Sequence, residues 1–179
     1  MTDPEILHGC LKHDRRAQRA LYEKHLPYLL AIIRRYGVAG EDVQDVVQET
    51  FTEIFITLAH FDPAVGPIRP WLARITIHRT LNHFRRTSRL NTNLKEAYPE
   101  RVSASPEVID TASVDAILAE LNRLPPAYRL VFNLYVVDGY SHAEIGELLG
   151  ITSEGSRTRL NRARAALRER LGTFAKNLP

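Results

Sequence analysis

The most constraining feature of this chain is a pair of short helical patterns that meet at a tight turn between Leu130 and Leu171. Ser141 is followed three residues later by Glu144, which is the capping-box pattern that starts a helix. Gly150 can adopt the left-handed conformation that ends one. Between them, apolar residues at spacings of three and four form a helical face made by Ile145, Leu148 and Leu149.

A second helix is predicted directly after this turn. Either Thr152 or Ser153 can cap its first turn, because both carry a side-chain hydroxyl. Two short helices joined this closely form a helix-turn-helix, and the second helix of such a motif normally enters the DNA major groove. Nucleic acid is therefore the first candidate partner.

Charge is sorted along the chain. Residues 36–68 contain no Lys or Arg but carry the acids Glu41, Asp42, Asp45, Glu49, Glu53 and Asp62. Residues 63–95 contain no Asp or Glu but carry Arg69, Arg74, Arg79, Arg85, Arg86, Arg89 and Lys95, with His78 and His83 beside them. A third block, with Glu169 as its one acid, carries Arg157, Arg159, Arg162, Arg164, Arg168 and Arg170.

Two separated basic blocks predict two contacts with a polyanion such as DNA. The acidic block would be repelled by DNA, so it is expected to face solvent or a basic protein.

Bulk properties exclude several classes of protein and site. A length of 179 residues suits one domain or two small ones. Cys10 is the single cysteine, which excludes an internal disulfide and a cysteine-based zinc site. No third ligand is spaced with His78 and His83, so neither a metal nor a cofactor is predicted. The N-terminus lacks a secretory pattern and no apolar run has the length of a membrane span, so we expect a cytoplasmic protein without membrane insertion.

Helical periodicity and the placement of Pro and Gly predict an all-α fold. Helices are expected over residues 3–36, 41–60, 70–86 and 114–124, before the three helical patterns of the C-terminal part. Pro27 is expected near a helix start or bend. The inward face of the helix that starts at Pro70 is predicted to contain Trp71, Leu72, Ile75, Leu81 and Phe84.

The same pattern divides the chain into two helical domains. Residues 91–112 are rich in Asn, Ser and Pro and show little periodicity, so they read as a flexible linker. The predicted domains are therefore residues 1–90 and residues 113–179, and the second contains the helix-turn-helix.

Three motifs, in this order and at these spacings, carry a resemblance to a known family. The run from Asp45 to Phe51 fits the pattern D-x-x-Q-E-x-F, and Trp71-Leu72 precedes a basic helix. The run from Arg159 to Arg164 fits R-L-x-R-A-R. Over its whole length the chain resembles a bacterial sigma factor of the extracytoplasmic-function group, in the sigma-70 family.

The resemblance implies a transcription initiation factor without catalytic activity of its own. Such proteins bind core RNA polymerase, recognise the promoter −35 and −10 elements and help to open the duplex; they are often held inactive by an anti-sigma factor, which is therefore a candidate partner. The resemblance assigns polymerase binding to Asp45, Gln48 and Glu49. Helical spacing puts these three on one side of a base-free helix, although a merely solvated acidic face would have the same pattern.

The resemblance also assigns the two basic blocks to promoter DNA. The −10 candidates are Arg69, Arg74, His78, Arg79, Asn82, Arg85 and Arg86. The −35 candidates are Ser153, Arg157, Thr158, Arg159 and Arg162. His78 and Asn82 depart from the Asn and Asp that are common in the family, which leaves base choice at −10 open.

Other classes of protein explain less of the sequence. An autonomous helix-turn-helix regulator, which usually dimerises on palindromic sites, leaves the acidic motif and the second basic block without a role. An enzyme is a poorer fit, because no catalytic spacing and no phosphate-binding glycine loop is recognisable. A protein that only sequesters polymerase would bind the core enzyme but not promoter DNA.

Overall fold

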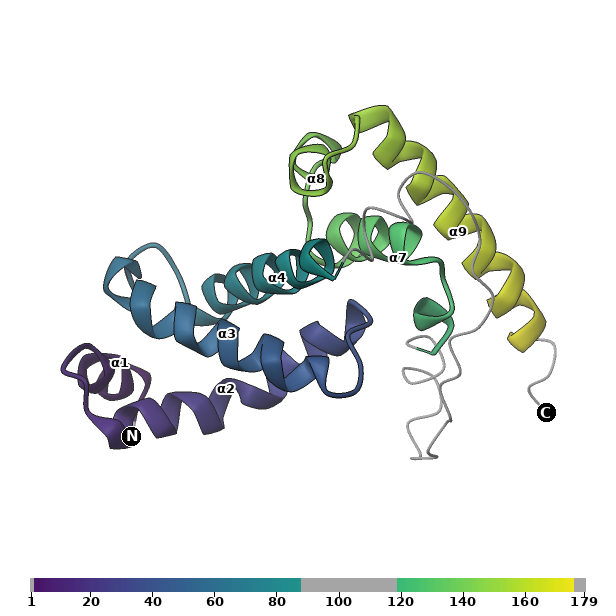
Figure 1. The fold of residues 1–179 in the computed structure, drawn as a ribbon. Helices are drawn as coiled ribbons and strands as arrows, with labels where there is room; N and C mark the ends of the chain where they lie inside the picture. The colour runs from purple at the N-terminus through teal and green to yellow at the C-terminus, as the bar shows by residue number, and fades with distance from the viewer. Residues whose placement is uncertain (1, 88–118, 176–179) are drawn as a thin grey trace. The chain divides into compact units, whose positions relative to one another are not determined.

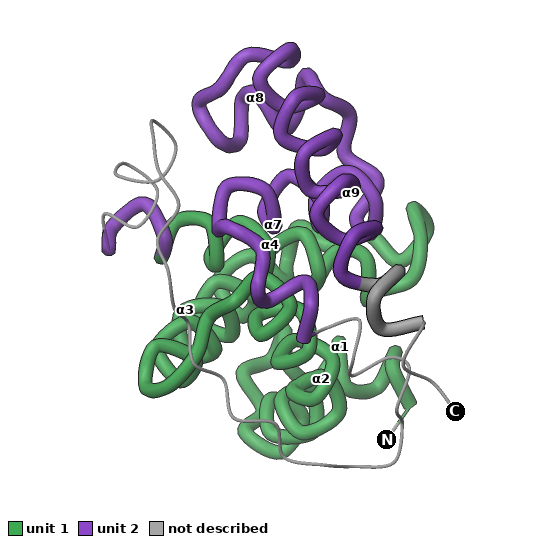
Figure 2. The backbone as a smooth tube through the Cα atoms, turned by 90° about the vertical axis from the view of Figure 1, so that its right-hand side faces the viewer, with its two compact units in different colours: residues 1–83 green, residues 84–179 purple. Residues whose placement is uncertain are grey.

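A computed structural model of the chain describes residues 2–87 and 119–175 (Figure 1). The predicted all-α fold with two helical domains is confirmed, and no strand occurs in these two described ranges. The chain separates into two compact units, residues 1–83 and residues 84–179 (Figure 2). The predicted linker, residues 91–112, lies outside the described residues, so the domain limits at residues 90 and 113 stay predictions.

Over the described residues from 2 to 83, the first unit contains four α-helices, which are α1 (Asp3–Leu11), α2 (Arg15–Arg35), α3 (Asp42–Thr57) and most of α4 (Ile68–Arg86). A short 3-10 turn, η1 (Leu58–His60), extends α3. Residues 41–60 and 70–86 are therefore helical as predicted, apart from the tighter last turn and small shifts at the ends.

The prediction of one continuous helical stretch over residues 3–36 was wrong. The chain breaks between Lys12 and Asp14, where His13 takes a left-handed φ of 58°. Asp14 then caps α2 by accepting a hydrogen bond from the Arg16 backbone N–H at 2.9 Å. The apolar period continues across the break, because both helices bury residues on the same core, and periodicity alone therefore hides it.

Pro27 lies inside α2, so the expectation that it starts a helix was wrong, and the alternative that it marks a bend stays a prediction. A proline within a helix removes one backbone hydrogen bond. Buried side chains on both sides of it, including Leu21, Leu29 and Ile33, hold the helix against the core despite this loss.

The buried face of helix α4 only partly matches the prediction. Leu72, Leu81 and Phe84 are buried as expected, whereas Trp71 and Ile75 are half-buried and Ile77 is buried instead. The buried hydroxyls of the α4 threonines are satisfied locally. They donate to carbonyls one turn earlier, at 2.8 Å in each case, from Thr76 to Leu72 and from Thr80 to Thr76.

The second unit contains α7 (Pro126–Phe132), a π-helical turn η2 (Asn133–Val137), α8 (His142–Leu149) and α9 (Ser153–Ala175). Leu121, Leu124, Ala163 and Leu167 form a core cluster that joins α9 to the residues before α7. Val131 and Leu134 are buried in this unit, whereas Val136 is 46% exposed and does not pack the core.

Arg129 is a buried cation within this unit. Its Nη1 donates to the Asn122 carbonyl at 3.0 Å, and burial lowers the pKa of the guanidinium to about 10. The carbonyl partly replaces the lost hydration of the charge.

No helix within the described ranges is long and apolar enough to cross a membrane.

Candidate nucleic-acid interface

The predicted acidic site lies on the solvent side of α3. Asp45 and Gln48 are exposed and Glu49 is half-buried. The opposite side of the same helix is buried through Val46, Val47, Thr50, Phe51 and Ile54. Spacings of three and four residues bring the three predicted side chains to one face, as the sequence indicated. The apolar side of α3 packs in the core, so the acidic side chains lie on its exposed side.

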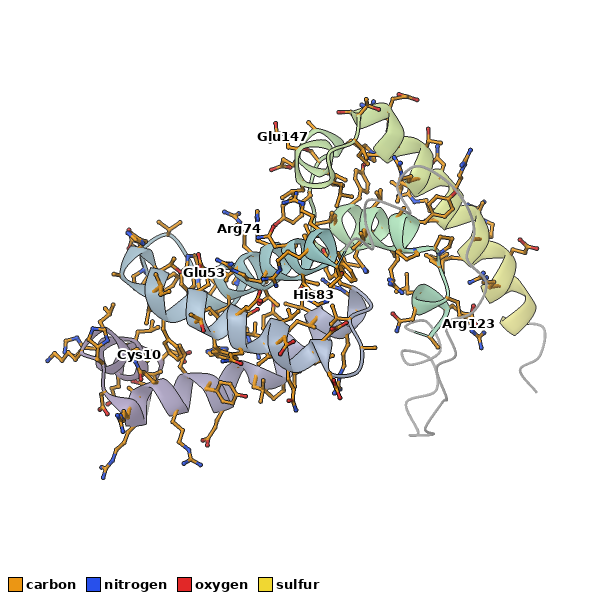
Figure 3. All side chains as sticks on the ribbon, viewed as in Figure 1. Cys10, Glu53, Arg74, His83, Arg123 and Glu147 are labelled. Carbon is orange, nitrogen blue, oxygen red and sulfur yellow. The ribbon has the colours of Figure 1, made fainter. Side chains whose placement is uncertain are left out.

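Glu53, one turn further along α3, faces α4 instead. Its Oε2 accepts from Arg79 Nη2 at 2.5 Å, and each side chain is about one-third exposed, at 31% and 33%. Figure 3 shows Glu53 between the two helices. The pair joins α3 to α4, so the structure places Arg79 in an ion pair within the protein rather than on an open basic surface.

The other predicted −10 residues divide between two places. Arg74, His78 and Arg85 are exposed and Asn82 is half-buried. Their spacings of four, four and three residues bring these four side chains together on one face of α4, which we call the α4 stripe. Figure 3 shows Arg74 on the side of α4 away from α3. Arg86 is also exposed at the end of α4.

Arg69 is separate from that stripe. It lies at the start of α4, where its guanidinium carbon is 5.1 Å from the centre of the Tyr28 ring, which is a cation–π geometry.

His83 belongs to the core rather than to the basic surface. It is buried, and its Nε2 lies 3.5 Å from the Asp42 carboxylate at the start of α3. The sequence does not reveal this contact, because it joins residues more than forty positions apart. Over the described residues, no group of three or more His, Cys, Asp or Glu side chains could hold a metal ion.

The helix-turn-helix forms by the local interactions predicted for it. Ser141 and Glu144 satisfy each other's backbone N–H groups at 3.3 and 2.8 Å, and Gly150 ends α8 with a left-handed φ of 65°. Of the two candidate caps for α9, Thr152 is the one that acts. Its Oγ1 accepts from the Gly155 backbone N–H at 2.9 Å.

The predicted −35 residues spread over several directions of α9. Arg157 and Thr158 are exposed, while Ser153 and Arg159 are half-buried. Arg162 is exposed but donates to the Tyr128 hydroxyl on α7 at 3.2 Å. Arg157 and Thr158 thus offer the most accessible polar groups of this set, near the start of α9.

A brace beside this surface was not predicted from the sequence. The His142 ring stacks on Tyr135, with centroids 4.3 Å apart, and its Nδ1 lies 2.9 Å from the Oγ of buried Ser156. Arg164 lies over the same Tyr135 ring at 5.9 Å. The brace fixes the start of α8 against α9, which sets the angle of the helix that carries Arg157.

This brace is expected to weaken in acid. Desolvation, and then Arg157 and Arg164, lower the pKa of His142 below its ordinary 6.5, while Glu154 raises it to a lesser degree. The unfolded chain therefore binds more protons than the folded one below that pH, and the stability of the second unit falls as pH decreases through 6.5 towards the folded-state pKa. NMR titration of the His142 ring protons checks this, and a midpoint at or above 6.5 would contradict it.

Comparison with known proteins gives two family matches. The model "Sigma-70 region 2" matches residues 21–90, and the model "Sigma-70, region 4" matches residues 115–167. The first range contains the acidic face and the α4 stripe, and the second contains the helix-turn-helix.

Individual relatives are similar over most of the chain. The chain is 33% identical over 159 residues to the ECF RNA polymerase sigma factor SigE of Mycolicibacterium smegmatis. The matched region covers 84% of this chain but only 60% of the length of SigE. It is 31% identical to the RNA polymerase sigma factor NccH of Alcaligenes xylosoxydans xylosoxydans, over 93% of this chain and 95% of the relative.

A solved structure has the same fold. CnrH, an RNA polymerase sigma factor of Cupriavidus metallidurans, was solved in complex with the cytosolic domain of CnrY. It is similar to this chain with a TM-score of 0.52 and 27% identity, over 96% of this chain and 97% of CnrH.

Proposed function

This chain belongs to the sigma-70 family as an extracytoplasmic-function sigma factor, which directs RNA polymerase to promoters, and from that premise we propose how its surfaces divide the task. The acidic face of α3 binds core polymerase, the α4 stripe binds the −10 element, and the start of α9 binds the −35 element. The observation that carries this division is the placement of opposite charges on separate exposed faces, acids on α3 and bases on α4 and α9.

Asp45, Gln48 and Glu49 form the polymerase contact in this proposal. An exposed acidic face beside a basic stripe cannot approach DNA without repulsion, so a basic protein surface suits it better. Such a partner gains Coulomb energy and a faster encounter with the chain.

Arg74, His78, Asn82 and Arg85 form the −10 contact. A row of cations and amide or imidazole donors suits melted DNA, because it follows the phosphates and leaves unstacked bases within reach. Arg86 extends the row at the end of α4, and Arg69, which lies apart from the row at the start of α4, makes a separate DNA contact. Arg79 mainly holds α4 against α3 through its ion pair with Glu53, and its contact with DNA is secondary.

Arg157 is the leading base-reading residue of the −35 contact. Arginine can pair bidentately with guanine in the major groove. Thr158 lies beside it, while Ser153, Arg159 and Arg162 grip the phosphates around the same site. Residues 1–90 and 113–179 then act as two DNA-binding domains connected by residues 91–112.

Further properties follow from the family. The chain has no catalytic activity of its own and acts in the cytoplasm, where polymerase and DNA are. A protein inhibitor of the anti-sigma type is its regulatory partner, which is supported by the similarity to CnrH, itself solved with a protein bound.

Reversing charge on the acidic face tests the polymerase contact. We expect Asp45→Lys/Glu49→Lys to weaken binding to core polymerase by about tenfold or more, since about 1.4 kcal/mol corresponds to tenfold. Binding is measured by fluorescence anisotropy of the labelled chain titrated with core enzyme.

Two further variants make this result interpretable. Asp45→Lys alone changes an exposed side chain and tests the charge without disturbing the fold. Glu23→Lys is the control, because it makes the same charge reversal at an exposed position of α2 outside the acidic face. Unchanged affinity in both the Asp45 single and the double variant would show that polymerase binds elsewhere. Sequence-specific DNA binding by the chain without polymerase would favour an autonomous regulator instead.

Arg157→Ala is expected to cost about 1–3 kcal/mol on promoters with an intact −35 element. Suitable promoters come from in vitro transcription of a genomic library with core polymerase, followed by sequencing of the starts. The cost is measured by competition between DNA fragments, and a fragment with a scrambled −35 element should show no such cost. Arg168→Ala removes an exposed arginine further along α9 and should not change the affinity for either fragment. An equal loss on both templates would assign Arg157 to phosphate.

A further inference from the structure

A buried histidine of α2 has no hydrogen-bond partner among the described residues. His25 is only 2% exposed, and both of its ring nitrogens are inaccessible to solvent and unpaired there. Buried polar groups are ordinarily satisfied, and an unsatisfied one is costly to bury. The cost would be far larger for the charged ring, because it carries a full charge and two N–H donors.

The charged groups around His25 do not offset this cost. Burial lowers the pKa of His25 below its ordinary 6.5, and this effect outweighs the attraction of Asp3 on α1. The Asp3 carboxylate is already paired with Lys24, at 2.5 Å between Oδ1 and Nζ. Lys24 and Arg69, which lies at the start of α4, both repel a charged ring. The folded chain therefore keeps the ring neutral at pH 7.

Helix α1 lies beside this histidine. One cavity is lined by His25, by Ile68 at the start of α4, and by residues of α1 that include Asp3, Leu7 and Leu11. Removing α1 would open this region to water. The ring of His25 could then be hydrated while the other helices of the first unit stay folded.

Helix α1 is also the element that can leave most easily. It has nine residues, of which Ile6 and Cys10 are buried, and a helix this short is not stable alone in water. Its connection to α2 is exposed and breaks the helix at His13, so α1 can move without unwinding α2. The Asp3–Lys24 ion pair that joins the two helices is about half exposed and therefore weak. Elements with few buried contacts open first.

We propose that α1 is an acid-sensitive element, which undocks from α2 when His25 is protonated. The undocked state hydrates the ring and binds the proton, so acid shifts the equilibrium towards that state. Because burial lowers the pKa of His25 in the docked state, docking is favoured above pH 6.5 and weakens as pH falls through 6.5 towards the docked-state pKa. Undocking also removes a wall beside Ile68, so the start of α4 loses support.

Cys10 provides the readout, because it is the single cysteine of the chain and is buried on α1. The full chain is labelled with methyl methanethiosulfonate at several pH values. Each rate is divided by the rate for the urea-unfolded chain at the same pH, which cancels the intrinsic pH dependence of the thiol. We expect this ratio to rise by about threefold or more from about pH 7.5 to about pH 5.5, with a limit of about tenfold for one histidine that titrates only in the undocked state.

Three variants assign the rise to His25. His25→Phe keeps a ring that cannot be protonated, so its labelling ratio should not change with pH, and it is expected to fold because an apolar ring replaces an unsatisfied polar one. His25→Gln cannot be protonated either and gives a second comparison that does not depend on packing a larger ring. His8→Gln is the matched control, because it removes an exposed histidine of α1 itself and should keep the rise.

The fluorescence of Trp71 distinguishes undocking of α1 from unfolding of the whole first unit. Its emission should stay constant over the pH range in which Cys10 labelling rises. Three results would overturn the proposal: a change in the labelling ratio of less than about twofold, the same rise in His25→Phe or His25→Gln, or a Trp71 shift that accompanies the rise. The experiment contains neither polymerase nor DNA, so its failure would leave the proposed sigma-factor function unaffected.

Discussion

Gly146→Ala is expected to destabilise the second unit by about 2 kcal/mol, although the same change in an ordinary helix stabilises by about 1 kcal/mol. A Cβ at Gly146 would lie 2.8 Å from the Ile151 backbone oxygen, which is closer than a carbon and an oxygen can approach. The Ile151 N–H donates to the Gly146 carbonyl at 3.0 Å, so the turn folds back onto this residue and cannot move away cheaply.

The measurement is amide hydrogen exchange in the second unit, which reports its stability separately from that of the first. Glu147→Ala, at the exposed neighbouring position on α8, is the matched control and should leave exchange almost unchanged. Promoters that depend on the −35 element should lose activity with Gly146→Ala, because α8 and α9 would no longer meet at the same angle. Stabilisation by Gly146→Ala would show that the turn moves to accommodate the added methyl group.

Gly9→Ala is expected to destabilise the first unit by about 2–3 kcal/mol. The added Cβ would lie 2.5 Å from the Cβ of Ala17, which is fully buried on α2. Helices α1 and α2 approach this closely because neither has a larger side chain at the contact. Chemical unfolding followed by the fluorescence of Trp71, which belongs to the first unit, measures the loss.

Gly66→Ala is the control for Gly9→Ala. A Cβ at Gly66 meets no atom within 4 Å, so its replacement should change stability by less than about 1 kcal/mol. If both variants have the same stability, the close approach of α1 to α2 does not limit the fold.

Local features of this chain were predictable because their causes lie within a few residues. Ser141, Glu144 and Gly150 act on backbone groups of the same helix, and the side of α3 on which Asp45 lies follows from helical spacing alone. The break at His13 was not predictable in this way. A left-handed histidine leaves no compositional trace comparable to that of glycine or proline.

Features that depend on distant residues were missed or misassigned for a physical reason. Arg79 meets Glu53 across 26 positions, so the sequence shows an arginine but not that its charge is already compensated. The close contacts of Gly9 and Gly146 exist only once two helices meet. The unsatisfied nitrogens of His25 likewise become visible only when every neighbouring group has been placed.

The Arg79–Glu53 pair changes how α4 should respond to ionic strength. A cation that neutralises a phosphate releases the counterions condensed on DNA, and each such contact steepens the decline of affinity with salt. An arginine that already holds a carboxylate adds less to that release, because the acid accompanies it to the duplex. Helix α4 should therefore bind DNA with a shallower salt dependence than its number of arginines implies, and Glu53→Gln should make that dependence steeper.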